Sequence, residues 1–396
     1  MKTTPKIVGM LILTLLIAQV WSLETPIVTA AGDDRDPSIL RLSNGFKVVA
    51  FSSDSGIQSF DVFMMIDRGT GWGQPFLAEM GGFADSRVDT VPDLVELSGN
   101  RIMVIWSQCL GSNCDIVYNI YNVTDSSWDP EGFTILIDDG SRNTRPSAIL
   151  MPSGSICVFW QSNQLGGARP NDIFYVCFPE DWQYPLPTPV MMPHSSSTVN
   201  EYNPSATLKD GLVWLAWDRD NNDIYLTVNS TGWAPPIQLT SDTNLDLGAS
   251  LTATGDGQLW LFWETDRDSG GSPELNIYYK RSYDPLNINS WLPDTRLTRA
   301  AGNDRSPSGA DVQPGTVGIV FTSNRDGAAL YDIYYTTIVR KSGDTDWDGD
   351  VDIDDLIGTY LAQFSTAPTN LYRYDVDQDG DIDLDDLILV FLRQFT

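Results

Sequence analysis

Asn303-Asp-Arg-Ser-Pro-Ser308 opens one unit of a repeat that occupies most of this chain. The unit continues with Ile319-Val-Phe-Thr-Ser-Asn-Arg-Asp-Gly327 and then with Asp332-Ile-Tyr-Tyr335. Its parts are a Pro-Ser turn, an apolar strand, a second strand that ends in an aromatic residue, a polar turn and a third strand. Because apolar segments alternate with turn residues, we expect short antiparallel strands throughout.

The same pattern recurs along the chain. The units open at Pro37-Ser38, Pro92-Asp93, Pro146-Ser147, Pro204-Ser205, Gly248-Ala249 and Pro307-Ser308. Their second strands end at Phe51, Trp106, Trp160, Trp217, Trp263 and Phe321. Their third strands begin at Asp61, Asp115, Asp172, Asp223, Asn276 and Asp332. Repeats of about 40–50 residues with four strands each are typical of propeller blades. The sequence therefore predicts an all-β, six-bladed β-propeller.

The sixth unit has no fourth strand of its own. The segment from Thr25 to Ser38 matches the segment from Thr295 to Ser308 at a constant offset, and Thr295 to Arg299 is the expected fourth strand of the fifth blade. By analogy, we expect Thr25 to Thr29 to complete the sixth blade. Pairing the two ends of the chain would close the ring and leave no open sheet edge.

The repeat resembles the TolB-type six-bladed propeller family through the three motifs quoted from the sixth unit, and sialidase-type propellers are a second resemblance. The similarity covers about Thr25 to Arg340. Arg35, Arg87, Arg145 and Arg305 lie near the turns, but no arginine triad of the sialidase type can be assigned among them.

Four cysteines stand at matching places in their repeat units. Cys109 and Cys114 flank one strand turn, and Cys157 and Cys177 have the same summed offset from their own strands. Opposed residues of an antiparallel pair have a constant index sum, so one register accommodates both pairs. We expect disulfides Cys109–Cys114 and Cys157–Cys177, as a secreted chain allows. Four free buried thiols are the alternative.

Two twelve-residue stretches near the C-terminus, Asp344 to Asp355 and Asp375 to Asp386, have the spacing of calcium loops. Carboxylates stand at loop positions 1, 3, 5, 9 and 12, a glycine stands at position 6, and position 7 supplies a backbone carbonyl. Calcium takes 6–8 oxygen ligands, which such a loop provides. We expect two calcium ions, held by Asp344, Asp346, Asp348, Asp350, Asp352, Asp355, Asp375, Asp377, Asp379, Asp381, Asp383 and Asp386.

A helix follows each loop but none precedes it, and the two units are 31 residues apart. This arrangement, from Gly343 to Thr396, resembles the dockerin family. The resemblance implies a small all-α domain that binds a cohesin-type protein and attaches its carrier, often a polysaccharide-degrading enzyme, to a scaffold. It also implies partner contacts at loop positions 10 and 11, which are Ile353, Asp354, Leu384 and Asp385 here.

The N-terminus predicts secretion. Residues 1–22 combine two lysines with a short apolar run and read as a signal peptide, with an uncleaved anchor as the alternative. We therefore expect a propeller over residues 23–340 and a dockerin-like domain over residues 341–396. The mature chain should be extracellular or attached to a cell surface, with no membrane span after cleavage. The formal net charge of −29 makes nucleic acid an improbable partner.

Carboxylates near the propeller turns are the weak catalytic candidates. Asp34, Asp89, Glu201 and Asp304 each stand three residues before the Pro that opens a unit. They would serve as acid and base in glycoside hydrolysis. The competing interpretation is that they cap turns by bonding their own backbone.

Three functions are compatible with these observations. We expect a secreted, calcium-binding propeller that docks to a cohesin-type partner and binds carbohydrate in polysaccharide breakdown. One alternative is a glycoside hydrolase that uses the propeller carboxylates, so whether the chain is an enzyme stays open. The other is a structural protein of the cell surface.

Overall fold

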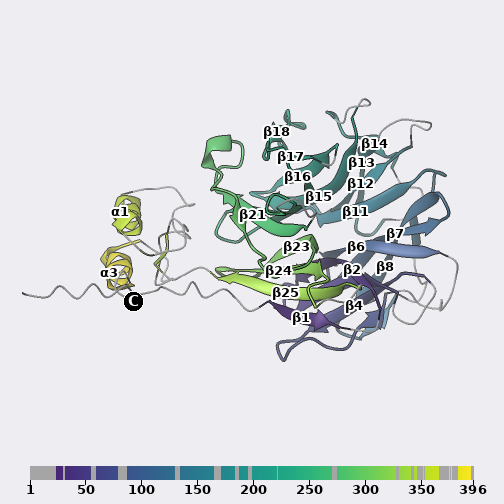
Figure 1. The fold of residues 1–396 in the computed structure, drawn as a ribbon, viewed down its shortest axis with the longest axis horizontal. Helices are drawn as coiled ribbons and strands as arrows, with labels where there is room; N and C mark the ends of the chain where they lie inside the picture. Colours follow the sequence, from purple (N-terminus) through teal and green to yellow (C-terminus); the bar gives the residue numbers. More distant parts are fainter. Residues whose placement is uncertain are drawn as a thin grey trace, which may run out of the picture.

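The computed structural model describes residues 24–29, 32–54, 59–78, 87–129, 134–164, 171–182, 187–194, 199–220, 222–269, 274–326, 330–339, 343–345, 351, 353–364, 374, 376 and 382–393. Within these ranges the chain forms six antiparallel sheets arranged as a ring (Figure 1). The predicted signal peptide lies outside the described residues. Among the described residues, no helix has the length and apolar character that crossing a membrane requires.

Each sheet is one blade, and its strands follow one another from the axis outward. The first three blades consist of β2 (Asp34–Arg41), β3 (Lys47–Ser53), β4 (Asp61–Asp67) and β5 (Phe76–Leu77); β6 (Val88–Leu97), β7 (Arg101–Leu110), β8 (Asn113–Asn122), β9 (Ser127–Trp128) and β10 (Thr134–Ile137); β11 (Asn143–Leu150), β12 (Ser155–Ser162), β13 (Asp172–Pro179) and β14 (Val190–Met191).

The last three blades consist of β15 (Glu201–Lys209), β16 (Leu212–Arg219), β17 (Asp223–Asn229) and β18 (Ile237–Gln238); β19 (Asp246–Ala253), β20 (Leu259–Thr265), β21 (Asn276–Ser282) and β22 (Thr295–Arg296); β23 (Asp304–Gln313), β24 (Thr316–Ser323), β25 (Asp332–Val339) and β1 (Thr25–Val28). A short 3-10 helix, η1 (Ile288–Ser290), precedes β22. The first strands of neighbouring blades contact one another all the way round, from β2 through β23 and back to β2. The six-bladed propeller predicted from the repeat is confirmed.

The ring is closed by the N-terminal strand, as the offset between the two ends of the chain predicts. Strand β1 pairs with β25, and Thr25 stands opposite Tyr335 while Val28 stands opposite Ile333. The last sheet thus takes its outermost strand from the start of the chain (Figure 1). Closure covers an edge that would otherwise offer unpaired backbone groups to solvent.

The aromatic residue near the end of each second strand packs between blades. Phe51, Trp106, Trp160, Trp217, Trp263 and Phe321 are all buried. The clusters around them combine side chains of adjacent blades, so each blade covers the apolar face of the next. Their burial provides the main apolar stabilisation of the ring.

Both predicted disulfides are present. Cys109 pairs with Cys114 across β7 and β8, and Cys157 pairs with Cys177 across β12 and β13. In each case the two cysteines are directly opposed in the strand register. The two disulfides are consistent with an oxidising compartment outside the cell.

The described residues of the C-terminal part form two helices, α1 (Ile353–Ala362) and α3 (Leu384–Arg393), which contact each other. They lie outside the ring of sheets (Figure 1). The all-β propeller is therefore followed by a small helical region, in agreement with the predicted fold class.

Candidate functional site

The carboxylates singled out as catalytic candidates lie at the starts of four innermost strands. Asp34, Asp89, Glu201 and Asp304 begin or follow closely on the first residue of β2, β6, β15 and β23, and all four are buried. None of them is among the described residues that line the two cavities on the propeller axis. Burial raises the pKa of Asp34 and of Asp304 to about 6.

Two of these carboxylates, Glu201 and Asp304, have side-chain partners on the second strand of their own blade or in the turn that follows it. Glu201 forms an ion pair with Arg219 at 2.8 Å. Asp304 accepts hydrogen bonds from Ser323 Oγ at 2.5 Å and from Arg325 at 2.8 Å. The arrangement ties first and second strands together inside a blade. It differs from the expected capping of the local backbone, because the donors are side chains of the second strand and the turn that follows it.

Every innermost strand contains a β-bulge, which lies two residues after the position that Asp34 and Glu201 occupy in their blades. The strand register shifts at this point in all six blades. The bulge residue has a positive φ in each blade, at Asp36, Val91, Arg145, Asn203, Gly248 and Ser306. A bulge bends its strand and redirects one side chain. These six residues line a cavity of about 140 Å³ on the axis, which we call the mouth cavity.

The amide of the bulge residue is held by the preceding blade. Val91 N–H donates to Ser52 Oγ at 3.1 Å, and Arg145 N–H donates to Ser107 Oγ at 2.9 Å. Asn203, Ser306 and Asp36 make the corresponding bonds with Gln161, Glu264 and Thr322. In each case the acceptor directly follows the aromatic residue of the second strand. Backbone strain at the positive φ is therefore supported by one repeated interblade bond.

The residue that directly follows the second-strand aromatic residue is an acid in two of the six blades. The first is Asp218, which is fully buried and accepts Asn203 Nδ2 on both carboxylate oxygens, at 2.8 and 2.9 Å. Burial raises the pKa of Asp218 to about 7, and the negative charge of Glu264 adds to this rise. The hydrogen bond from Asn203 and the positive charge of Arg145 oppose it.

The second acid is Glu264, which lines the mouth cavity next to Gly248. Its Oε2 accepts the amide of Ser306 at 2.8 Å, and Ser306 Oγ donates to Asp36 Oδ1 at 2.9 Å. Burial raises the pKa of Glu264 as well. Asp36, Arg145, Asn203, Glu264 and Ser306 line the mouth cavity, and Asp218 lies behind Asn203. We call these six residues the mouth cluster.

A belt of hydrogen bonds lies beneath the mouth cavity. It is formed by the residue two positions after each bulge residue, namely Ser38, Asp93, Ser147, Ser205, Ser250 and Ser308. In the fifth blade the turn is therefore Ala249-Ser250, one residue later than the predicted Gly248-Ala249. Ser147 Oγ, for example, accepts Ala206 N–H of the next blade at 3.0 Å. Asp93 accepts both Ser38 Oγ at 2.9 Å and Ala148 N–H at 2.8 Å. The belt residues also line a second axial cavity of about 320 Å³, so the belt separates two compartments.

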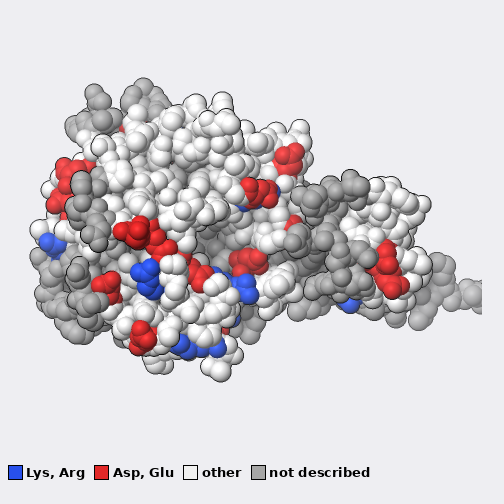
Figure 2. All heavy atoms as spheres, turned by 180° about the vertical axis from the view of Figure 1, so that it is seen from behind, with Lys and Arg blue, Asp and Glu red and all other residues white. Residues whose placement is uncertain are grey.

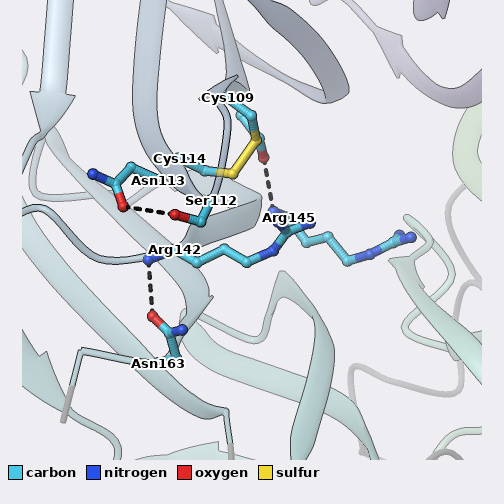
Figure 3. Close-up of a disulfide and its surroundings, with 8 residues drawn as sticks. Cys109, Ser112, Asn113, Cys114, Arg142, Arg145 and Asn163 are labelled. Carbon is cyan, nitrogen blue, oxygen red and sulfur yellow. Dashed lines mark hydrogen bonds between the residues drawn. A yellow bond between two sulfur atoms is a disulfide. The ribbon is translucent and has the colours of Figure 1, made fainter. Parts of the chain in front are cut away.

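The hairpin of β7 and β8 lies beside the mouth cluster. Its tip carries the Cys109–Cys114 disulfide (Figure 3). The backbone of Cys114 also pairs with that of Arg142 in an isolated β-bridge. Figure 3 also shows Arg145, whose amide is held by Ser107 of β7. The disulfide therefore staples the end of a hairpin that positions one member of the mouth cluster.

The C-terminal loops show the same contact twice. The carboxylate of Asp355, at position 12 of the first loop, accepts the amide of Thr345 at position 2. The carboxylate of Asp386 accepts the amide of Val376 at 2.5 Å, again from position 12 to position 2. Asp344, Asp355 and Asp386 are buried, as expected of carboxylates turned into a loop. Oxygen-rich loops closed in this way fit the ligand preference of calcium.

The other predicted calcium ligands except Asp383 lie outside the described residues, namely Asp346, Asp348, Asp350, Asp352, Asp375, Asp377, Asp379 and Asp381. Within the described part of the chain, no three His, Cys, Asp or Glu side chains are grouped so that they could hold a metal ion. The calcium sites stay a prediction.

The two helices expose matching apolar faces. Residues 31 apart occupy equivalent places, and the exposed pairs are Ile353 and Leu384, Ile357 and Ile388, Tyr360 and Phe391, and Leu361 and Leu392. All eight side chains are between 45% and 64% exposed. Of the four predicted partner residues, Ile353, Leu384 and Asp385 are exposed, and the side chain of Asp354 lies outside the described part. Contiguous exposed apolar faces mark interaction sites.

Similar folds are known among solved structures. A protein of unknown function from Dyadobacter fermentans has a TM-score of 0.66 and 12% identity, covering 82% of this chain and 100% of that chain. Trypanosoma rangeli sialidase in complex with the inhibitor DANA has a TM-score of 0.61 and 12% identity, covering 86% and 60%. A leech intramolecular trans-sialidase complexed with 2,7-anhydro-Neu5Ac has a TM-score of 0.59 and 11% identity, covering 81% and 70%.

No protein-family model matches the sequence, and no curated protein sequence is similar to it. At these low identities, the structural likeness shows the shared propeller fold alone.

Of the mouth cluster, only Arg145 was singled out from the sequence, as an arginine near a turn, because the candidate carboxylates were sought three residues before each Pro. The signal was one residue before it, at Asp36, Arg145, Asn203 and Ser306, together with the residue after each second-strand aromatic.

Proposed function

We propose that this chain is a secreted adaptor-bearing propeller, whose C-terminal segment docks to a cohesin-type protein and whose propeller binds carbohydrate in polysaccharide breakdown. The observation that carries the docking part is the pair of matching apolar faces on α1 and α3. An isolated pair of amphipathic helices normally covers such side chains, so their exposure favours a protein partner. The dockerin-like spacing of the two loops supports the partner class.

Calcium is part of this proposal. Bound ions would neutralise the clustered carboxylates and lock each loop onto its helix, with Asp355 and Asp386 as closing ligands. Asp355 accepts the Thr345 hydroxyl at 3.1 Å, and its own carbonyl accepts the Thr359 hydroxyl at 2.9 Å. These contacts join the loop to the first turns of α1. Ligand closure and helix position should therefore be linked.

The carbohydrate part rests on the propeller. Sugar-processing proteins are named among the structural neighbours, and the mouth cavity is a concave polar site on the axis. The hydrolase alternative receives less support, because Glu201 and Asp304 are buried in ion pairs within their blades. Figure 2 shows acidic and basic side chains interspersed over one face of the propeller, so that face is not uniformly acidic despite the net charge.

The docking proposal is tested with full-length protein, calcium and immobilised cohesin modules of several types. Three variants replace apolar side chains by Asp: Ile357→Asp with Tyr360→Asp in α1, Ile388→Asp with Phe391→Asp in α3, and all four together. Because the faces are equivalent, either pair alone should weaken binding by only a few fold, whereas the fourfold variant should lose about 100-fold or more.

The matched control is Leu110→Asp, which changes an exposed apolar residue of the propeller. It should bind as the unchanged protein does. Unchanged cohesin binding by the fourfold variant, or no binding by the unchanged protein to any module, would contradict the docking proposal.

A further inference from the structure

The six blades provide an internal comparison for the mouth cluster. The residue after the second-strand aromatic is Ser52, Ser107, Gln161 or Thr322 in four blades, and each accepts the bulge amide of the next blade. An uncharged side chain is therefore sufficient for the structural role. Blades four and five instead place Asp218 and Glu264 there.

The acids carry a cost that the uncharged residues do not. Burying a carboxylate disfavours its charged form, and the pKa of Asp218 and of Glu264 is raised for this reason. Asn203 is committed to Asp218 through Nδ2, while its Oδ1 is buried and has no hydrogen-bond partner among the described residues. Glu264 lines the cavity, and Asp218 holds Asn203, which lines it too. Acids kept at such a cost at a cavity, where an uncharged residue serves the fold in other blades, indicate a binding role.

The chemistry of the cluster defines what it can take. Asp36 and Glu264 offer carboxylate oxygens to the cavity, and Asn203 offers an amide oxygen. Asp218 does not line the cavity; it lies behind Asn203 and holds that side chain through both carboxylate oxygens. Arg145 is the cation that lines the same cavity, and Ser306 already donates its hydroxyl proton to Asp36. Acceptors therefore outnumber donors. A ligand that donates hydrogen bonds is complementary, whereas a ligand carboxylate would meet several like charges at low dielectric.

We propose that the mouth cluster is the sugar-binding site of the propeller and that it takes a non-anionic sugar, whose hydroxyl or ammonium groups bind Asp36, Glu264 and the amide oxygen of Asn203, with Asp218 as the residue that positions Asn203. This inference rests on the proposed carbohydrate function and adds its location and ligand class. It separates this propeller from the structural neighbours that hold sialic-acid derivatives, because those ligands carry a carboxylate.

The test uses full-length protein in calcium and isothermal titration with a fixed panel. Neutral cello-, xylo- and malto-oligosaccharides, lactose and amine-bearing chitosan oligomers are compared with 3′-sialyllactose and oligogalacturonate. Lactose and 3′-sialyllactose form a matched pair that differs by one sialic acid. At least one neutral or amine-bearing sugar should bind about 10-fold or more tightly than either anionic sugar.

Variants then locate the site. Asp218→Ser and Glu264→Ser copy the residue of the first two blades and should keep the fold, while affinity falls about 10-fold or more. Glu264→Gln removes the charge but retains an acceptor for Ser306 N–H, so it separates loss of charge from loss of that bond. The control is Ser52→Thr, at the same position of the first blade, which should bind normally.

Each contrary outcome has a different meaning. Unchanged affinity in both Ser variants would place sugar binding elsewhere and overturn this inference while the carbohydrate proposal stands. Tighter binding of the anionic sugars would overturn the ligand class. Binding of no panel member would overturn this inference and the carbohydrate part together, and would leave cohesin docking to its own test.

Discussion

The propeller and the C-terminal segment are both built by repetition, yet they place their repeated aromatic residues differently. In the propeller, Trp106, Trp160, Trp217 and Trp263 recur at one position of the blade and are buried between sheets. In the helices, Tyr360 and Phe391 recur 31 residues apart and are about half exposed. A ring of six blades covers each repeated face with the next copy, and the ends of the chain close it.

Two copies cannot close a ring, so a face remains on each. The helices α1 and α3 contact each other and bury Ala362 and Val390, while four apolar side chains per helix stay exposed. The difference indicates that repetition serves stability in the propeller and partner recognition in the C-terminal segment.

A pair of aromatic truncations tests the contrast directly. Trp263→Ala removes a fully buried ring whose Nε1 donates to Asp246 at 3.0 Å, and should lower the free energy of unfolding by about 4 kcal/mol. Tyr360→Ala removes an exposed ring and should change stability by less than about 0.5 kcal/mol. Urea unfolding followed by tryptophan fluorescence and circular dichroism measures both. Comparable losses would mean that the helical face is structural.

The pH dependence of Asp218 sharpens the contrast within the propeller. Its folded pKa of about 7 lies above the ordinary value of 3.8, so its contribution to stability is complete below pH 4 and is lost as the pH rises through 7. The groups that act on it are Glu264, Asn203 and Arg145. Because one pKa unit corresponds to about 1.4 kcal/mol, Asp218→Asn should stabilise the propeller at pH 8 by about 4 kcal/mol relative to its effect at pH 4.

Unfolding free energies of the two proteins at pH 4 and pH 8 measure this difference. A difference that does not change with pH would show that Asp218 titrates normally and would remove the support that its raised pKa gives to the mouth cluster.

The belt provides a smaller effect. Asp93→Ala leaves Ser38 Oγ and Ala148 N–H without their acceptor and should cost about 2 kcal/mol. Asp93→Ser restores the residue found in the other five blades and should recover most of this loss. Thermal unfolding of both variants provides the comparison. Equal stability of the two would mean that the belt does not couple the blades.

Much of the fold follows from local patterns in the sequence. The blade count, the disulfide pairing and the closing strand from Thr25 onward all depend on periodic strand segments and a constant register between neighbours. Such features recur in six units, so the strands of an ambiguous unit can be assigned by comparison with the other five. They could therefore be predicted without knowledge of side-chain packing.

The site could not be predicted in the same way. A one-residue bulge in every innermost strand turns Arg145 and Asn203 toward the axis, and a residue count cannot reveal which side chain a bulge redirects. Asp218 and Glu264 come from second strands, whose approach to the axis depends on three-dimensional packing. The exposed faces of α1 and α3 could not be predicted either, because the sequence does not show whether another part of the chain packs over these apolar side chains.

The most direct test of the account is a calcium titration of the full-length chain, freed of metal with a chelator and followed by isothermal titration calorimetry. Two ions should bind, with Asp355→Asn and Asp386→Asn each abolishing or strongly weakening one site, and circular dichroism should report helix formation on binding. Absence of calcium binding, or two unchanged sites in both variants, would contradict the assignment of the C-terminal segment as a calcium-organised docking module.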